Sequence, residues 1–169
     1  RKQVKHLGLE MHVRFLDYVS DNELAGLYAH ASAYVSPSLY EGFGFTPLEA
    51  MASGTPVVCS DGGSLPEVVG DAALIAPAQD TDALIKAILR VLPGGSDELR
   101  KNLVIRGYEQ INRFSWSHAA EQTLAILEHA FGVKGQASGK EPAAKGPALS
   151  SCNILSIPVH DVTFSETLD

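Results

Sequence analysis

Short apolar runs alternate with helical patterns along most of this chain. Runs of strand type lie at residues 13–16, 33–36, 57–59 and 73–76, and a segment with helix-capping residues or helical periodicity follows each of them. Strands that alternate with helices form parallel βαβ units, because the helix carries the chain back to the same end of the sheet. The sequence therefore predicts an α/β fold with a partial Rossmann-like parallel sheet and helices on both faces.

The starts and ends of the helices are marked by residues that cap them. Serine followed three residues later by glutamate, the spacing of a capping box, occurs at Ser20 and at Ser64. Gly54 and Gly70 suit the left-handed conformation that often closes a helix. Three further helices are expected to begin at Asp80, Ser96 and Ser115.

Composition argues against several classes of protein. The 169 residues carry a formal net charge of −7 and 45% are hydrophobic, which is typical of a globular domain. An acidic chain argues against nucleic-acid binding, which relies on Lys and Arg. No apolar run reaches the ~18 residues of a membrane span. Cys59 and Cys152 suggest neither a disulfide framework nor a zinc site, so a cytoplasmic location is expected.

The chain changes character after residue 131. Residues 132–151 are rich in Gly, Ala, Lys, Pro and Ser without an apolar period, which is typical of a flexible linker. The chain also starts without Met, which we interpret as the mark of a fragment. We predict a remnant of an upstream segment at 1–12, one domain at 13–131, and a linker with an unassigned tail at 132–169.

The segment EGFGFTPLE, residues 41–49, has the pattern of a ligand site. Gly42 and Gly44 can take positive φ and let the backbone approach a ligand closely. Thr46 and Pro47 then open a helix, with Pro expected at the first helical position. A helix start offers N–H donors and a positive partial charge, and ligands bind at the carboxyl ends of parallel strands. The segment therefore predicts an anion site that can hold a diphosphate.

The two glutamates of this segment each have two interpretations. Glu49 stands three residues after Thr46, so the pair can form a capping box; alternatively, the carboxylate accepts hydrogen bonds from adjacent hydroxyls, as in a ribose diol. Glu41 is either a solvated loop charge or a contact to hydroxyls or developing positive charge. A diphosphate site needs no carboxylate beside it, so a sugar nucleotide explains Glu41 more easily.

These residues and their flanking segments resemble a known family. The matching pieces, in order and at family-like intervals, are VRFLDYVSDNELAGLYAHA, YVSPSLYEGFGFTPLEAMASGTPVVCSD, GGSLPEVVGDAALI and RFSWSHAAE. Over residues 13–131 the chain resembles the carboxyl-terminal, donor-binding domain of retaining glycosyltransferases with two Rossmann domains (the GT-B fold), of the group 1 or family 4 type. The signature is a pair of glutamates separated by seven residues, here Glu41 and Glu49.

The resemblance implies a role for each residue of the segment. Glu41 would be catalytic, contacting the transferred sugar and stabilising charge near the anomeric carbon. Glu49 would hold the ribose hydroxyls, and Thr46 would reach a phosphate. The sugar or the distal phosphate would be held by the backbone amides of Gly42, Phe43, Gly44 and Phe45.

The resemblance also implies a base contact and a donor. Tyr18 and Val19 would lie along the nucleobase, although the family commonly has glycine where this chain has Asp17, and a plain strand–helix connection also explains the turn. The substrate would be a UDP- or GDP-hexose, transferred to an unknown acceptor. No cofactor and no metal are expected, because the segment at residues 41–49 has no Asp-x-Asp cluster to hold a metal against the diphosphate.

Part of the family's pattern is not found upstream of Val13. Family members have an amino-terminal Rossmann domain with the acceptor site, and first strands with an Arg and a Lys that grip the diphosphate. The fragment alone is therefore expected to be inactive, and any peripheral membrane association is expected from the amino-terminal domain. Two other hypotheses stay open: a non-catalytic, glycosyltransferase-like interaction module, and a relative of glucan phosphorylases.

Overall fold

The computed structural model describes residues 1–131, so the predictions for residues 132–169 lie outside the described part. The chain divides into two compact units, Arg1–Ile111 and a second one that begins at Asn112. The predicted domain at 13–131 crosses this division. Each unit is described by itself.

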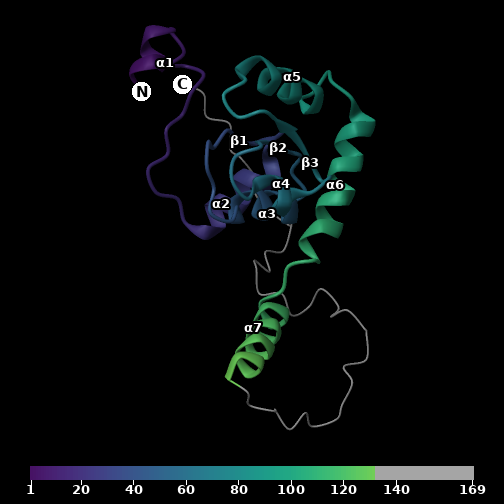
Figure 1. Ribbon diagram of the computed structural model, residues 1–169. Helices are drawn as coiled ribbons and strands as arrows, with labels where there is room; N and C mark the ends of the chain where they lie inside the picture. The colour runs from purple at the N-terminus through teal and green to yellow at the C-terminus, as the bar shows by residue number, and fades with distance from the viewer. Residues whose placement is uncertain (132–169) are drawn as a thin grey trace. The chain divides into compact units, whose positions relative to one another are not determined.

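Three parallel strands form the sheet of the first unit, in the order β1-β2-β3 (Figure 1). They are β1 (Tyr34–Ser36), β2 (Val57–Ser60) and β3 (Ala73–Ala76). The register aligns Val35 of β1 with Val58 of β2, and Val58 with Leu74 of β3. Every residue of β2 is buried, as expected for a central strand that is covered on both faces.

Helices cover both faces of this sheet, because alternate side chains of a strand point to opposite sides. The helices of the unit are α1 (Lys2–His6), α2 (Asp21–His30), α3 (Phe45–Ala52), α4 (Leu65–Val69), α5 (Thr81–Val91) and α6 (Asp97–Ile111). Val57 and Cys59 pack into a core with residues of α2, α3 and α4. Val58 packs on the other side with residues of α5 and α6, and Figure 1 shows α5 across the strands from α3 and α4. The predicted α/β fold is confirmed.

Most of the predicted helix caps are confirmed. The Ser20 hydroxyl accepts a hydrogen bond from the Glu23 amide, and the Glu23 carboxylate accepts one from the Ser20 amide at 2.8 Å, which completes the capping box of α2. Asp80 accepts from the Ala83 amide at 2.9 Å at the start of α5. Ser96 accepts from the Leu99 amide at 3.2 Å, next to α6. Gly54 follows α3 with φ of +74°, whereas Gly70 ends α4 with φ of +54° and ψ of −131°, which is not the left-handed helical conformation expected of it.

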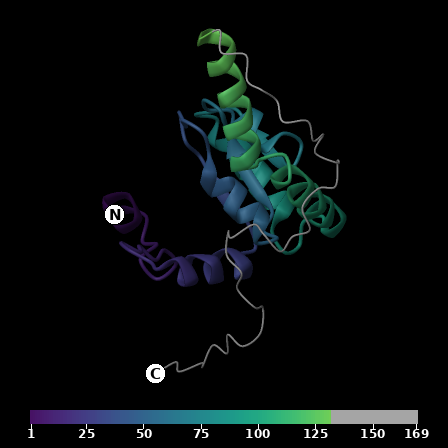
Figure 2. The ribbon, with the colours of Figure 1, turned by 90° about the horizontal axis from the view of Figure 1, so that it is seen from below.

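The predicted strand at residues 13–16 is wrong: these residues form no strand, and the described sheet has three strands instead of four. A strand needs a neighbour that pairs its backbone groups, and the described sheet has no strand beyond β1. Val13, Phe15 and Leu16 remain 37%, 48% and 50% exposed. Figure 2 shows this amino-terminal segment, in purple, standing away from the sheet.

The predicted capping box at Ser64 is also wrong. Ser64 has helical backbone angles and its side chain caps no helix amide. The hydroxyl instead contacts backbone carbonyls of the loop that follows β1. A tertiary contact has therefore replaced the local one that the spacing predicted.

The second unit contains α7 (Trp116–Phe131). Its predicted cap is present, since the Ser115 hydroxyl accepts from the His118 amide at 3.4 Å. An exposed apolar face of α7 is lined by Trp116, Leu124 and Leu127, among others. None of the helices in the described residues is both long enough and apolar enough to span a membrane.

Cys59 is a core residue, as predicted. Its side chain is fully buried in β2. Burial raises the pKa of its thiol to about 11, because the apolar surroundings disfavour the thiolate.

We expect Cys59 to be almost unreactive in the folded protein, because the thiolate is the nucleophile and the side chain is inaccessible. The measurement is alkylation by iodoacetamide at about pH 8 in a Cys152→Ser variant, followed by mass spectrometry with and without urea. The unfolded thiol titrates near 9.0 and the folded one near 11, so its contribution to the free energy of unfolding should decline as pH rises between these values. Equal alkylation rates with and without urea would contradict this assignment.

Candidate functional site

The loop after β1 is held against the turn after β2. The Ser60 hydroxyl donates to the carbonyl oxygen of Ser38. The amide and the hydroxyl of Ser64 lie 3.2 and 3.0 Å from the carbonyl oxygen of Glu41, and the same hydroxyl lies 2.7 Å from that of Phe43. Because both segments follow the carboxyl ends of parallel strands, these contacts place the Glu41 backbone at the sheet edge where ligands bind.

Two glycines let these segments approach. A Cβ atom on Gly63 would lie 2.5 Å from the carbonyl oxygen of Glu41, and Gly63 has φ of +62°. A Cβ atom on Gly62 would collide with the carbonyl oxygen of Ser38 and lie 2.8 Å from the carbonyl carbon of Leu39. The sequence-based site did not include Gly62, Gly63 or Ser64. Paired glycines between a buried strand and a helix were the signal that could have found them.

The glycines of the predicted anion site differ in conformation. Gly44 is the N-cap of α3 with φ of +108°, and a Cβ there would lie 3.2 Å from Leu65 Cδ2. Gly42 has no positive φ and open space around it, so the predicted left-handed conformation is confirmed for Gly44 only. The helix begins at Phe45, and Pro47 is therefore its third residue rather than its first. The first turn of α3 follows Gly44 directly, so the amino-terminal end of the helix, with its N–H groups, lies beside the loop after β1 that carries Glu41 (the Glu41 loop, residues 37–44).

Thr46 and Glu49 do not form the capping box that their spacing allows, because Gly44 and not Thr46 is the N-cap. Thr46 Oγ1 accepts a hydrogen bond from the Tyr34 hydroxyl at 2.8 Å. Glu49 Oε2 accepts one from the Tyr28 hydroxyl at 3.2 Å. The capping interpretation of Glu49 is therefore wrong, and its carboxylate is held by a side chain from another helix.

The Tyr28 hydroxyl acts as the hydrogen-bond donor to Glu49. Its side chain is buried, and burial is the main reason that the pKa of its phenol is raised well above the usual range. The Glu49 carboxylate raises it further, because a phenolate beside a carboxylate is repelled. The phenol therefore stays protonated and donates to Glu49 over the accessible pH range.

Glu41 is held through its backbone, and its side-chain carboxylate is available to a ligand. The residue is partly buried, and Ser64 holds its carbonyl oxygen. Among residues 1–131 no hydrogen bond or ion pair engages the carboxylate. A charged group that is positioned by its backbone and has no structural partner is available to a ligand.

Tyr18 and Val19 lie outside this network of loops. Tyr18 is 89% exposed, and its neighbour Asp17 forms a largely exposed ion pair with Arg1 at 2.9 Å. Such surface pairs contribute little to stability. The predicted contact of Tyr18 and Val19 with a nucleobase stays a prediction.

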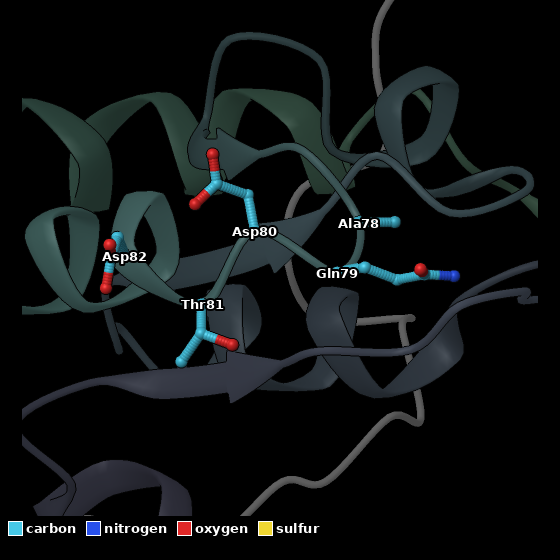
Figure 3. A pocket seen from close by; sticks show the side chains of 5 residues that line it. All are labelled: Ala78, Gln79, Asp80, Thr81 and Asp82. Atoms are coloured by element: carbon cyan, nitrogen blue, oxygen red, sulfur yellow. The ribbon is translucent and has the colours of Figure 1, made fainter.

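A surface hollow of about 550 Å³ lies elsewhere, at the turn between β3 and α5 (Figure 3). It is lined by Ala78, Gln79, Asp80, Thr81 and Asp82. The labelled side chains point in different directions, and Asp80 is used as the cap of α5. The lining includes two carboxylates and no Lys or Arg, so its side chains by themselves do not suit a diphosphate, and we do not assign this hollow to the candidate site. Within the described residues, no cluster of three or more His, Cys, Asp or Glu side chains could hold a metal.

Comparison with known proteins identifies the class. Residues 1–110 match the family model of glycosyl transferases group 1, and the chain belongs to this family. It is 49% identical over 112 residues to O-antigen chain mannosyltransferase B of Escherichia coli, covering 66% of this chain and 29% of that one. It is 43% identical over 133 residues to the MMP alpha-(1->4)-mannosyltransferase of Mycolicibacterium hassiacum, covering 76% and 32%.

The fold is similar to part of a solved structure, sucrose-phosphate synthase from Thermosynechococcus elongatus. The TM-score is 0.67 with 34% identity, and the match covers 78% of this chain and 33% of that one. The predicted GT-B type of sheet and the resemblance to group 1 glycosyltransferases are thereby confirmed. The chain spans about a third of the length of these relatives.

Proposed function

We propose that this chain is the donor-binding part of a retaining glycosyltransferase that transfers a hexosyl group from a UDP- or GDP-hexose. The observation that carries the proposal is Glu41: Ser64 holds its backbone carbonyl in the loop before α3, and its carboxylate has no hydrogen bond or ion pair among residues 1–131. The family membership supports glycosyl transfer, and two of the similar proteins are named mannosyltransferases. The acceptor side would come from an amino-terminal Rossmann domain, and the expected location is cytoplasmic.

Each part of the site has a task in this proposal. The amides from Gly42 to Phe45 and the Thr46 hydroxyl hold the phosphates and the sugar, using the positive end of α3 instead of a metal. Glu49 accepts hydrogen bonds from the ribose hydroxyls. Glu41 stabilises the positive charge that develops at the anomeric carbon as the bond to the diphosphate breaks.

The test is calorimetric binding of GDP-mannose and UDP-glucose to the full-length protein. At least one of them should bind, and Glu49→Ala should weaken that binding about tenfold or more, because a carboxylate that accepts from hydroxyls is lost. Glu109→Ala is the matched control, since Glu109 is an exposed glutamate of α6. A protein that binds neither probe would contradict the proposal and favour the interaction module.

A further inference from the structure

Two tyrosines from different elements direct their hydroxyls at one turn of α3. Tyr28 belongs to α2 and Tyr34 begins β1. Their rings pack edge to face, with centroids 5.7 Å apart and an interplanar angle of 70°. Tyr34 donates to Thr46 at 2.8 Å and Tyr28 donates to Glu49 at 3.2 Å. Residues three apart on a helix share a face, so the aromatic pair fixes two neighbouring side chains at once.

We propose that Tyr28 and Tyr34 are positioning residues of the donor site, which fix the Glu49 carboxylate for the ribose hydroxyls and the Thr46 hydroxyl for a phosphate. This inference rests on the proposed function, because it assigns the tyrosines to the same ligand.

The contact to Glu49 restricts the carboxylate before a ligand arrives. Tyr28 occupies Oε2 and leaves Oε1 for a ligand hydroxyl, while the carboxylate can still accept more than one hydrogen bond. A free glutamate would lose rotamer freedom on binding, and a glutamate that is already held loses less. The Tyr28 ring is buried and its pKa is raised, so the donor does not ionise and release Glu49.

The hydrogen bond from Tyr34 determines where the hydroxyl proton of Thr46 points. The Thr46 oxygen accepts from Tyr34, and its own O–H is then directed to another acceptor. Phosphate oxygens are acceptors, so the tyrosine turns Thr46 into a donor toward the place where the phosphate is expected. Without Tyr34 the Thr46 hydroxyl could rotate freely.

The backbone and ring of Tyr28 are held independently of its hydroxyl. Its carbonyl oxygen accepts from the Thr55 hydroxyl and from the Ala31 amide, and its side chain belongs to the buried core that also contains Met51 and Val57. Tyr28→Phe therefore removes one hydroxyl and keeps the packing. This separation makes the positioning role testable.

The experiment is a double-mutant cycle in the full-length protein, read by calorimetry with GDP-mannose and UDP-glucose. Tyr28→Phe should raise the Kd of the bound donor about 3- to 10-fold. In a Glu49→Ala background the same substitution should have no further effect, because the side chain that it positions is gone. For the second pair, Tyr34→Phe should raise the Kd to a similar extent, and it should have no further effect in a Thr46→Ala background. Tyr108→Phe on α6 is the control for losing a phenol hydroxyl: this hydroxyl lies near Gly54, beyond the end of α3, and is not the donor to Glu49 or Thr46, so the Kd should stay unchanged.

The outcomes separate this inference from the proposed function. If Glu49→Ala weakens donor binding but Tyr28→Phe has no effect, or has an undiminished effect in the Glu49→Ala background, the positioning role is overturned while the proposed function stands. If neither probe binds the unmodified protein, or if Glu49→Ala leaves the Kd unchanged, the proposed role of Glu49 fails and the inference fails with it.

Discussion

Glu41→Ala should lower kcat/KM for glycosyl transfer by about 10²- to 10³-fold in the full-length protein, as expected when a group aimed at developing charge is removed. The carboxylate has no hydrogen bond among the described residues, so its loss should leave the fold intact. The loop should also stay in place, since Ser64 binds the backbone carbonyl of residue 41 rather than the side chain. The measurement is steady-state kinetics with the donor that calorimetry identifies.

The kinetic parameter that changes will distinguish the role of Glu41. A loss in kcat with little change in donor affinity indicates a contact that strengthens in the transition state. Glu109→Ala, an exposed carboxylate lost from α6, should leave both values unchanged. Near-normal turnover of the Glu41 variant would overturn its catalytic assignment.

Gly63→Ala should damage both stability and activity. The new methyl group would lie 2.5 Å from the carbonyl oxygen and 2.8 Å from the nitrogen of Glu41, and the φ of +62° is unfavourable for alanine. The backbone must shift, at a cost of about 1–3 kcal/mol in the free energy of unfolding. Because the atoms that move belong to Glu41, kcat/KM should fall by about 10²-fold. Urea denaturation and steady-state kinetics measure the two effects.

Two other glycines provide matched controls for this substitution. Gly26→Ala in the interior of α2 meets no atom within 4 Å and should stabilise the protein by roughly 0.5–1 kcal/mol. Gly42→Ala also meets open space, although it lies in the Glu41 loop, and should be tolerated by the fold. A Gly63 variant as stable and active as the Gly26 variant would show that the two loops do not need their close approach.

The features that the sequence predicted correctly depend on neighbours along the chain. The capping box at Ser20 and the cap at Asp80 form between residues three apart, so their spacing can be recognised in the amino-acid sequence. The buried strand around Cys59 follows from a run of apolar side chains. The segment at residues 41–49 was found because glycines and a helix start occur together.

The errors occurred where a tertiary partner competes with a local one. Ser64 has the spacing of a cap, but two backbone carbonyls of the β1 loop take its hydroxyl. Thr46 and Glu49 have the spacing of a capping box, but Gly44 becomes the N-cap and two tyrosines bind their side chains. The local pattern predicts only that a hydrogen bond will form, and not with which partner.

The sequence by itself determined the α/β alternation, most of the helix caps and the place of the candidate site on the chain. Only the tertiary structure decided that Gly63 and Ser64 hold the Glu41 loop and that Tyr28 holds Glu49. It also decided that residues 13–16 form no strand, since the described sheet offers them no partner. The physical reason is common to all three: periodicity and capping are properties of nearby residues, whereas pairing across loops depends on which segments the sheet brings together.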